Sequence, residues 1–168
     1  MSMTISEPMT MLTDYLITVT CTWFGVRLLK DNWFEASVAR ALWGFGFLAI
    51  AGAALTGGSF HGFRLHLSEG SLALLWNVTI FLIGLTAGAM LAGFYAAFPP
   101  RREPCVRWLL AGLATSVIAW ILLAFQVGFH EQFNHNDLFH LIQLAGFYFF
   151  FRGALQLEDR HVYRARKR

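Results

Sequence analysis

The stretch LALLWNVTIFLIGLTAGAMLAGFYAAF, residues 72–98, decides the fold because it carries no charged side chain along its whole length. A run of about 20 apolar residues is long enough to cross the hydrocarbon layer of a bilayer as an α-helix. Similar runs recur on both sides of it. Five spans are predicted, over roughly 11–29, 38–60, 72–98, 106–127 and 136–157. The sequence therefore predicts an all-α, polytopic integral membrane bundle with five transmembrane helices, forming a single domain over residues 1–168.

The composition supports this class. Hydrophobic residues make up 57% of the chain and charged residues only 14%, whereas a soluble domain carries about 25% charged residues. Five buried helices of a soluble protein are excluded because no amphipathic layer would remain to face water. The first span has no Lys or Arg before it and no small-residue cleavage site after it. It is therefore expected to be a retained anchor, with its helix capped near Thr13 or Asp14.

The basic residues predict the orientation of the helices. Of the 13 Lys and Arg residues, all but Arg64 flank one predicted face of the membrane. Because Lys and Arg favour the cytoplasmic side, the N-terminus is expected outside and the C-terminus inside, in the cell inner membrane. Residues 158–168 then form a basic cytoplasmic tail. The net charge of +3 reflects this topology and anionic lipid headgroups, and no nucleic-acid motif is present.

Small and aromatic residues indicate how the helices pack. The small residues recur every four positions: Ala49, Ala53 and Gly57 in the second span, and Gly84, Gly88 and Ala92 in the third. This spacing lets helix backbones approach closely in lipid, so both stripes are expected to pack inside the bundle. The first stripe continues to His61, which should then point inward. The aromatic run 147–151 is expected to face lipid.

A polar cluster interrupts the apolar pattern in HEQFNHNDLFHLIQ, residues 130–143. Residues three or four apart share a helix face, so Asn136 and Asp137 share the face of His140, and Gln143 follows one turn later. Unpaired polar groups inside a span are costly and usually functional. Asn136 or Asp137 is also a suitable N-cap for the last helix.

The predicted topology brings more polar residues to the same depth. His61 ends the second span on the outer side, where His135 and His140 open the fifth. Asp14 and Asn77 lie on that side as well. Histidine and carboxylate ligands bind Zn²⁺, and three such ligands plus one water form its usual catalytic site. A metal site near the outer leaflet is therefore one interpretation.

Two short patches, SFH at 59–61 and HNDLFHL at 135–141, resemble the ceramidase-like superfamily of membrane hydrolases. This group includes alkaline ceramidases, adiponectin/progestin receptors and Per1-like proteins. The chain resembles in particular small uncharacterised bacterial membrane proteins with an FNHNDLFH-type motif. The resemblance implies that His61 matches the first zinc ligand of the superfamily and His140 the second histidine of an HxxxH pair. Asn136 stands where that pair has its first histidine, and the superfamily has seven helices.

The resemblance also implies an activity and a cofactor. It implies a hydrolase-like protein that uses zinc and acts on a lipid amide or ester at the outer leaflet. His61 and His140 would hold the ion, with Asp137 or His135 as the third ligand.

Further residues would support the reaction. Ser59 or Asn77 would hydrogen-bond the attacking water or the developing oxyanion, and Asp137 is also a catalytic candidate. Asn136 and Gln143 would surround the ligands, with Gln143 orienting His140.

Two other interpretations stay open at this point. The protein could be a non-enzymatic membrane subunit that uses its small-residue faces to associate with partner helices or with a second copy of itself. Alternatively, His61 and His140 could be axial ligands of a haem, or bind a quinone.

Overall fold

The computed structural model describes residues 4–32, 37–97, 103–130 and 133–159. It contains five α-helices: α1 (Pro8–Asn32), α2 (Val38–Phe63), α3 (Glu69–Ala97), α4 (Glu103–Ala124) and α5 (His135–Ala154). No β-strand occurs among the described residues. The all-α prediction and the number of helices are confirmed, with helix ends within a few residues of those expected. Most of the predicted basic tail, residues 160–168, lies outside the described residues.

Two predicted helix starts need correction. Helix α1 begins at Pro8, a residue type that suits the first helical turn because its missing N–H would have no partner there. Asp14 therefore lies inside the helix rather than at its cap. In α5 the N-cap is Asn134, not Asn136 or Asp137. The Asn134 side chain accepts from the Asn136 N–H, and the Asp137 carboxylate accepts from the Asn134 N–H, which forms a capping box.

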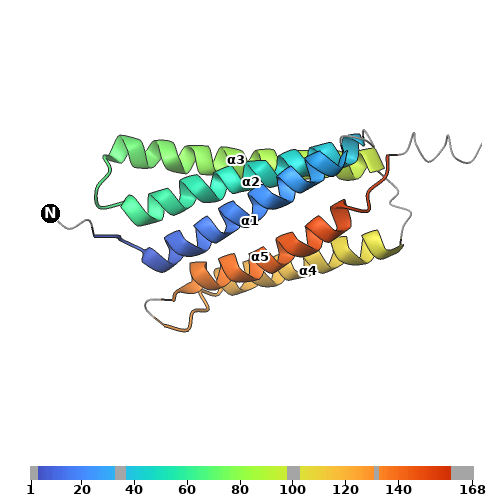
Figure 1. Cartoon of the computed structure of the whole chain (residues 1–168). Helices are drawn as coiled ribbons and strands as arrows, with labels where there is room; N and C mark the ends of the chain where they lie inside the picture. The colour runs from blue at the N-terminus through green and yellow to red at the C-terminus, as the bar shows by residue number, and fades with distance from the viewer. Residues whose placement is uncertain (1–3, 33–36, 98–102, 131–132, 160–168) are drawn as a thin grey trace, which may run out of the picture.

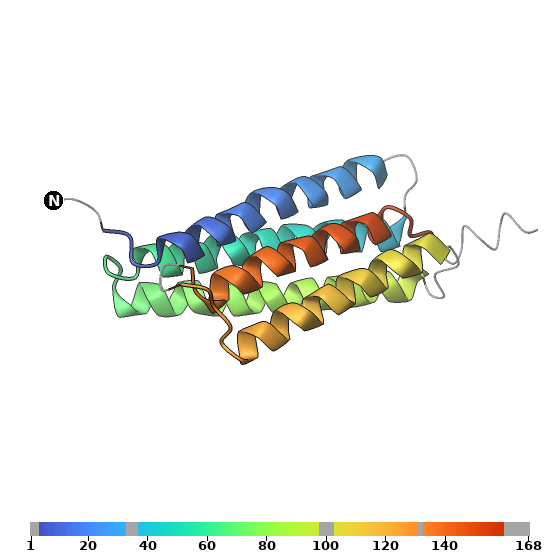
Figure 2. The same cartoon turned by 90° about the horizontal axis from the view of Figure 1, so that it is seen from below.

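The helices run alongside one another, with consecutive helices antiparallel (Figures 1 and 2). Helix α2 packs against α1 and α3, α4 packs against α5, and α1 joins the two groups through α5. Within the described residues, α3 and α4 are not a packed pair. The bundle is therefore closed along α1 and open between α3 and α4.

An aromatic core fills the half of the bundle where α5 ends. Phe24 of α1 and Phe151 of α5 stack at 4.4 Å between ring centroids, with an interplanar angle of 12°. Phe47 of α2 meets both rings edge-on and is fully buried. Phe147 is buried as well. The prediction that residues 147–151 face lipid is wrong for Phe147 and Phe151, because they fill the contact between α1, α2 and α5.

The chain after α5 turns back over the start of α2. The Asp159 carboxylate accepts hydrogen bonds from the Ser37 hydroxyl and from the Val38 and Ala39 N–H groups, at 2.7–3.0 Å. A carboxylate is favourable at this position because the first N–H groups of a helix have no partner within it. The Arg40 side chain donates to the Leu157 carbonyl beside it.

Three helices are long and apolar enough to cross a membrane: α2, α3 and α4 over Pro104–Ala124. Most of α3 and α4 is exposed on the outside of the bundle. The stripe Ala49, Ala53 and Gly57 is buried, as expected, and His61 continues it. The other stripe, Gly84, Gly88 and Ala92, is exposed, so the prediction that it packs inside the bundle is wrong. Helix α3 uses Thr79, Thr86 and Gly93 to meet α2 instead.

Candidate functional site

The first turns of α1 and α5 meet through polar side chains. Thr10, Thr13 and Asp14 are three and four residues apart, so they share one face of α1, and Asp137 and His140 share one face of α5. The Thr10 hydroxyl donates to Asp137 Oδ1 at 2.8 Å. Thr13 Oγ1 lies 3.0 Å from His140 Nδ1, and Asp14 Oδ1 lies 3.5 Å from His140 Nε2. Helix α1 thus contacts Asp137 and His140, two of the predicted site residues in α5.

These contacts determine where His140 carries its protons. The Thr13 hydroxyl donates its only proton to the Thr10 carbonyl, so its oxygen can only accept from His140 Nδ1. His140 therefore carries a proton on Nδ1. The Nε2 atom and the Asp14 carboxylate form an ion pair when Nε2 is also protonated. When it is not, Nε2 is a free base and metal-ligand position beside Asp14.

His61 is held at the same end of the bundle by the segment that enters α1. Its Nδ1 lies 3.0 Å from Glu7 Oε2, and the neighbouring Ser6 N–H donates to the Gly62 carbonyl. Ser59 pairs with the Tyr15 hydroxyl at 3.1 Å and donates to the Leu55 carbonyl.

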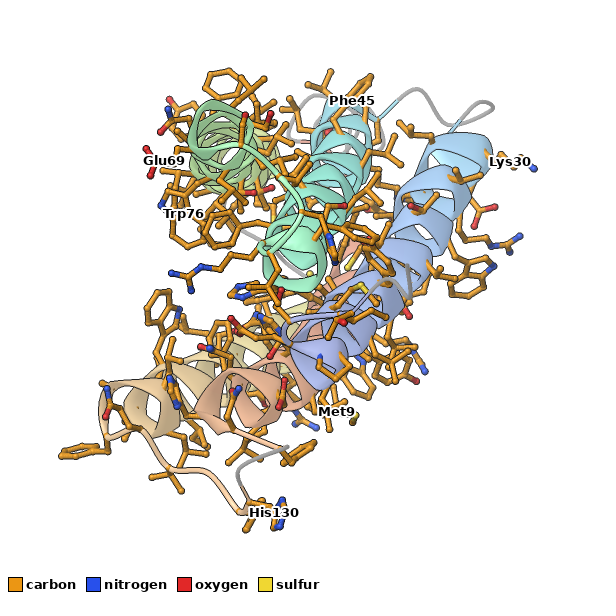
Figure 3. The ribbon with its side chains drawn as sticks, turned by 90° about the vertical axis from the view of Figure 1, so that its left-hand side faces the viewer. Met9, Lys30, Phe45, Glu69, Trp76 and His130 are labelled. Carbon is orange, nitrogen blue, oxygen red and sulfur yellow. The ribbon has the colours of Figure 1, made fainter. Side chains whose placement is uncertain are left out.

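A cavity of about 380 Å³ connects these elements. All five helices contribute to its wall, which lies where α3 and α4 do not pack. Figure 3 views the bundle along its axis and shows Trp76 on the side of α3 that faces α4. Most of the lining is apolar. Asp14, His61, Asn136 and His140 line the cavity near one end of the bundle.

The structure brings together only part of the predicted site. His61, His140, Asn136 and Gln143 line the cavity. Ser59, Asn77, His135 and Asp137 do not belong to its lining. Asn77 is exposed. Asp137 is 0% exposed, and each of its two oxygens accepts one hydrogen bond, from Thr10 and from Asn134.

Sequence reasoning placed Asp14 at the same depth as the histidines but did not assign it as a ligand or catalytic residue. Asp14 lines the cavity and is the acid in contact with His140. An acid within an apolar span was the signal, because such residues face the bundle interior and pair there. Thr13, which contacts His140, carries no comparable signal, since Thr is common in membrane helices and usually bonds to its own backbone.

The side chains as placed do not form a complete zinc site. Across the part of the chain that the structure describes, no three His, Cys, Asp or Glu side chains lie close enough together to hold an ion. His140 Nε2 and Asp14 Oδ1 provide one pair of donors. Asp137, one of the predicted third ligands, uses its oxygens to join α1 and to cap α5.

Fold and cavity together define an all-α protein with helices suited to a membrane and a mainly apolar cavity that ends in acidic and imidazole groups. The chain matches the family described as "Family of unknown function (DUF6962)" over residues 9–103 and 89–159. The chain therefore belongs to this family. No curated protein and no solved structure matches it.

Proposed function

We propose that this protein binds a membrane lipid or a similar single-chain amphiphile in the cavity between α3 and α4. The observation that carries the proposal is the polarity of the cavity, whose wall is mainly apolar and whose ionisable groups, Asp14, His61 and His140, lie near one end. An amphiphile has the same distribution, with an alkyl chain and a polar head. Ligand cavities generally combine an apolar lining with a few placed polar groups.

The proposal requires the whole bundle to lie in a bilayer, with all five helices crossing it. Helices α1 and α5 have 25 and 20 residues, or about 37 Å and about 30 Å at 1.5 Å per residue, which is enough to span. They are less apolar than the other three because they carry more polar residues, which include those that pair with each other. The excess of Lys and Arg on one side supports the N-outside, C-inside orientation in the inner membrane.

Cysteine labelling in intact cells tests this topology. Cys21 and Cys105 are buried and should label poorly. Ser68→Cys, in the exposed connection between α2 and α3, should react with an impermeant maleimide from outside. Lys30→Cys, exposed at the end of α1, should react only after the membrane is permeabilised. The opposite pattern would reverse the proposed orientation.

Binding is tested with a fluorescent single-chain lipid and a variant that fills the cavity. Ala87 lines the cavity yet is exposed on α3, so Ala87→Phe adds bulk there without overpacking a buried contact. Ala114, exposed on α4 and not part of the cavity lining, provides the matched control Ala114→Phe. We expect Ala87→Phe to weaken binding at least tenfold and Ala114→Phe to leave it unchanged. Equal binding by both variants would contradict the cavity as the binding site.

A second candidate function is hydrolysis of a lipid amide or ester at the polar end of the cavity, with zinc as the resemblance implies. The observation in its favour is that both cavity histidines have Nδ1 engaged, His61 by Glu7 and His140 by Thr13. Metal-binding histidines are oriented in this way by a bond to the other ring nitrogen. Asp14 would then be the acidic ligand in place of Asp137.

Metal analysis after gentle purification tests this second candidate. The hydrolase candidate requires near-stoichiometric zinc in the wild-type protein, unchanged zinc in Asp137→Asn, and loss of zinc in His140→Ala. Wild-type protein without bound metal would remove the hydrolase proposal but leave amphiphile binding intact. An absorbance scan of the same sample tests the haem alternative, which requires a Soret band.

Association with partner helices is a third candidate, favoured by the exposed stripe Gly84, Gly88 and Ala92 on α3. Small residues at this spacing permit close helix contacts in lipid. Gly88→Leu should abolish a homo-oligomer seen by cross-linking in membranes if this face associates with a second copy. Unchanged cross-linking would contradict that role.

A further inference from the structure

A cluster of aromatic and basic side chains joins α4 to α5 at the end of the bundle opposite to the ionisable groups of the cavity. Trp108 of α4 stacks on Phe149 of α5, with 5.8 Å between ring centroids and an interplanar angle of 28°. The guanidinium carbon of Arg152 lies 4.9 Å from the centre of the Trp108 ring and 5.9 Å from that of Tyr148. The guanidinium group therefore lies between side chains of both helices.

Most of the hydrogen-bonding capacity of Arg152 is unused. Its Nη1 donates to the Tyr148 hydroxyl at 2.9 Å, one helical turn earlier on the exposed surface of α5. No carboxylate of a described residue forms an ion pair with it. Arg27, at the same end of the bundle, is by contrast paired with Asp31 at 3.1 Å. Arg152 is half-buried, so its remaining N–H groups can still reach an anion from outside.

A second arginine lies beside the same indole ring. An open groove of about 390 Å³ on α4 is lined by Pro104, Arg107, Trp108 and Ala111. Arg107 is exposed. Trp108 thus lines the groove and also contacts the Arg152 guanidinium group. The surface around this ring combines two cations with apolar area.

The depth of the two arginines in a bilayer follows from their helices. Arg107 is about 6 Å from the start of α4 at Glu103, and Arg152 is about 3 Å from the end of α5 at Ala154. Helix ends of spanning segments lie near the lipid headgroups, where Trp and Tyr are also enriched. In the proposed orientation this end is cytoplasmic, and anionic lipids are abundant in that leaflet.

We propose that Arg107, Trp108 and Arg152 form a binding site for the head of an anionic phospholipid, separate from the cavity. A guanidinium group can donate two parallel hydrogen bonds to phosphate oxygens while it stacks on an aromatic ring. Basic pockets between membrane helices on the cytoplasmic side bind such heads. The Tyr148 hydroxyl and the Trp108 ring orient the guanidinium group before the lipid arrives, which lowers the entropy cost of binding.

The same cluster disfavours a zwitterionic head. Phosphatidylcholine would bring its quaternary ammonium group close to two guanidinium groups. Aromatic faces attract such a cation, but the Trp108 and Tyr148 rings already contact Arg152. The site should therefore select phosphatidylglycerol over phosphatidylcholine with the same acyl chains.

Lipid binding to the purified full-length protein in detergent tests the site. Native mass spectrometry measures the affinity for each lipid, and thermal melting measures the stabilisation that each lipid provides. We expect the wild-type protein to bind phosphatidylglycerol about tenfold more tightly than phosphatidylcholine, which corresponds to hydrogen bonds to a charged group. Arg152→Gln should lose this preference. Arg107→Gln, at an exposed position that tolerates the change, should reduce it.

Two further variants serve as controls. Arg27→Gln removes an arginine at the same end of the bundle that is already paired with Asp31, and it should keep the preference. Ala87→Phe fills the cavity, and it should keep the preference as well. Circular dichroism without added lipid establishes that each variant is folded. If Arg152→Gln does not fold, Arg107→Gln carries the test.

The possible results distinguish this site from the cavity. Equal binding of the two lipids by the wild-type protein, or an equal loss in Arg27→Gln and Arg152→Gln, overturns the proposed site and leaves amphiphile binding in the cavity standing. A preference lost in Ala87→Phe would place the anionic lipid in the cavity and also overturns it. Inorganic phosphate that stabilises the protein as much as phosphatidylglycerol would overturn the assignment to a lipid. A preference lost in Arg152→Gln and kept in both controls supports the site.

Discussion

The two ends of the bundle join α1 to α5 by different means. Where both helices begin, the contact consists of polar pairs, with Thr13 and Asp14 against His140. Where both helices end, Phe24 stacks on Phe151 at 4.4 Å. At the polar end, Asp14 and His140 line the cavity. At the aromatic end, the space between the helices is filled by side chains of the hydrophobic core.

The difference indicates that the two ends of the α1–α5 pair have different roles. Aromatic packing provides dispersion contacts that require no solvent and no ligand. Polar pairs in a membrane bundle gain less, and they are retained mainly where a site needs them. The aromatic end should therefore determine stability, and the polar end should determine binding. Each of the following substitutions tests this assignment.

The largest expected effect is on stability, from Phe47→Ala. Phe47 is fully buried and contacts rings from α1, α2 and α5. Removing it leaves a cavity, and we expect the free energy of unfolding to fall by about 3 kcal/mol. Unfolding in denaturing detergent, followed by circular dichroism, measures the change. Amphiphile affinity at low temperature should stay within twofold of wild type, and a greater loss would mean that the two ends are not independent.

Asp159→Asn should have the next largest effect, again on stability. The Asp159 carboxylate is buried and caps α2 by accepting from the Ser37 hydroxyl and two N–H groups. Hydrogen bonds to a charged group contribute about 1.5–3 kcal/mol, so we expect a loss of about 2 kcal/mol.

Glu69→Gln provides a matched control for Asp159→Asn. Glu69 is also an acid in the first turn of a helix, but it is exposed at the start of α3. Its neutralisation should change the stability by no more than about 0.5 kcal/mol. Similar losses from both variants would show that the Asp159 contacts add nothing beyond a helix-end charge effect.

At the polar end, Asp14→Asn and Asp137→Asn should have opposite consequences. Asp14 lines the cavity beside His140, so replacing its carboxyl group with an amide should weaken amphiphile binding about tenfold and change stability little. Asp137 accepts from Thr10 and from the Asn134 N–H. In Asp137→Asn, the new NH₂ group faces one of these two donors and cannot accept from it. This should cost about 1–2 kcal/mol of stability and leave binding unchanged. Titration with the fluorescent lipid and thermal melting separate the outcomes, and a binding defect in Asp137→Asn would restore Asp137 to the site.

The choice between Asp14 and Asp137 shows where sequence reasoning reached its limit. Hydropathy predicted the five helices because a span is a local property of about 20 residues. Helix periodicity placed His61 and His140 toward the interior, and both line the cavity. Periodicity cannot say which neighbouring helix faces a residue, so it could not show that α1 pairs with Asp137.

Pairing between helices also explains the wrong expectation for α3. The stripe of Gly84 and Gly88 resembles that of Ala53 and Gly57 in sequence, yet only the α2 stripe is buried. Helix α2 lies between α1 and α3, whereas α2 is the helix against which the described part of α3 packs closely. The position of a helix in the bundle decides whether its small residues are covered, and a single span does not contain that information.

The smallest expected effect is that of Thr13→Val, which tests whether α1 positions His140. Thr13 Oγ1 lies 3.0 Å from His140 Nδ1, and its proton is donated to the Thr10 carbonyl. Valine has nearly the same shape but cannot accept the Nδ1 proton. We expect amphiphile binding to weaken by about threefold, in line with the loss of one modest hydrogen bond.

A spectroscopic measurement separates positioning from a general packing defect in Thr13→Val. Nitrogen NMR of labelled histidine should show His140 with its proton on Nδ1 in the wild-type protein and with a mixture of tautomers in the variant. Thr18→Val provides the control, because the Thr18 hydroxyl donates to the Asp14 backbone carbonyl one turn earlier in the same helix. An unchanged His140 signal in Thr13→Val would mean that Thr13 does not set the proton position, and that Nε2 is not held available for the cavity by α1.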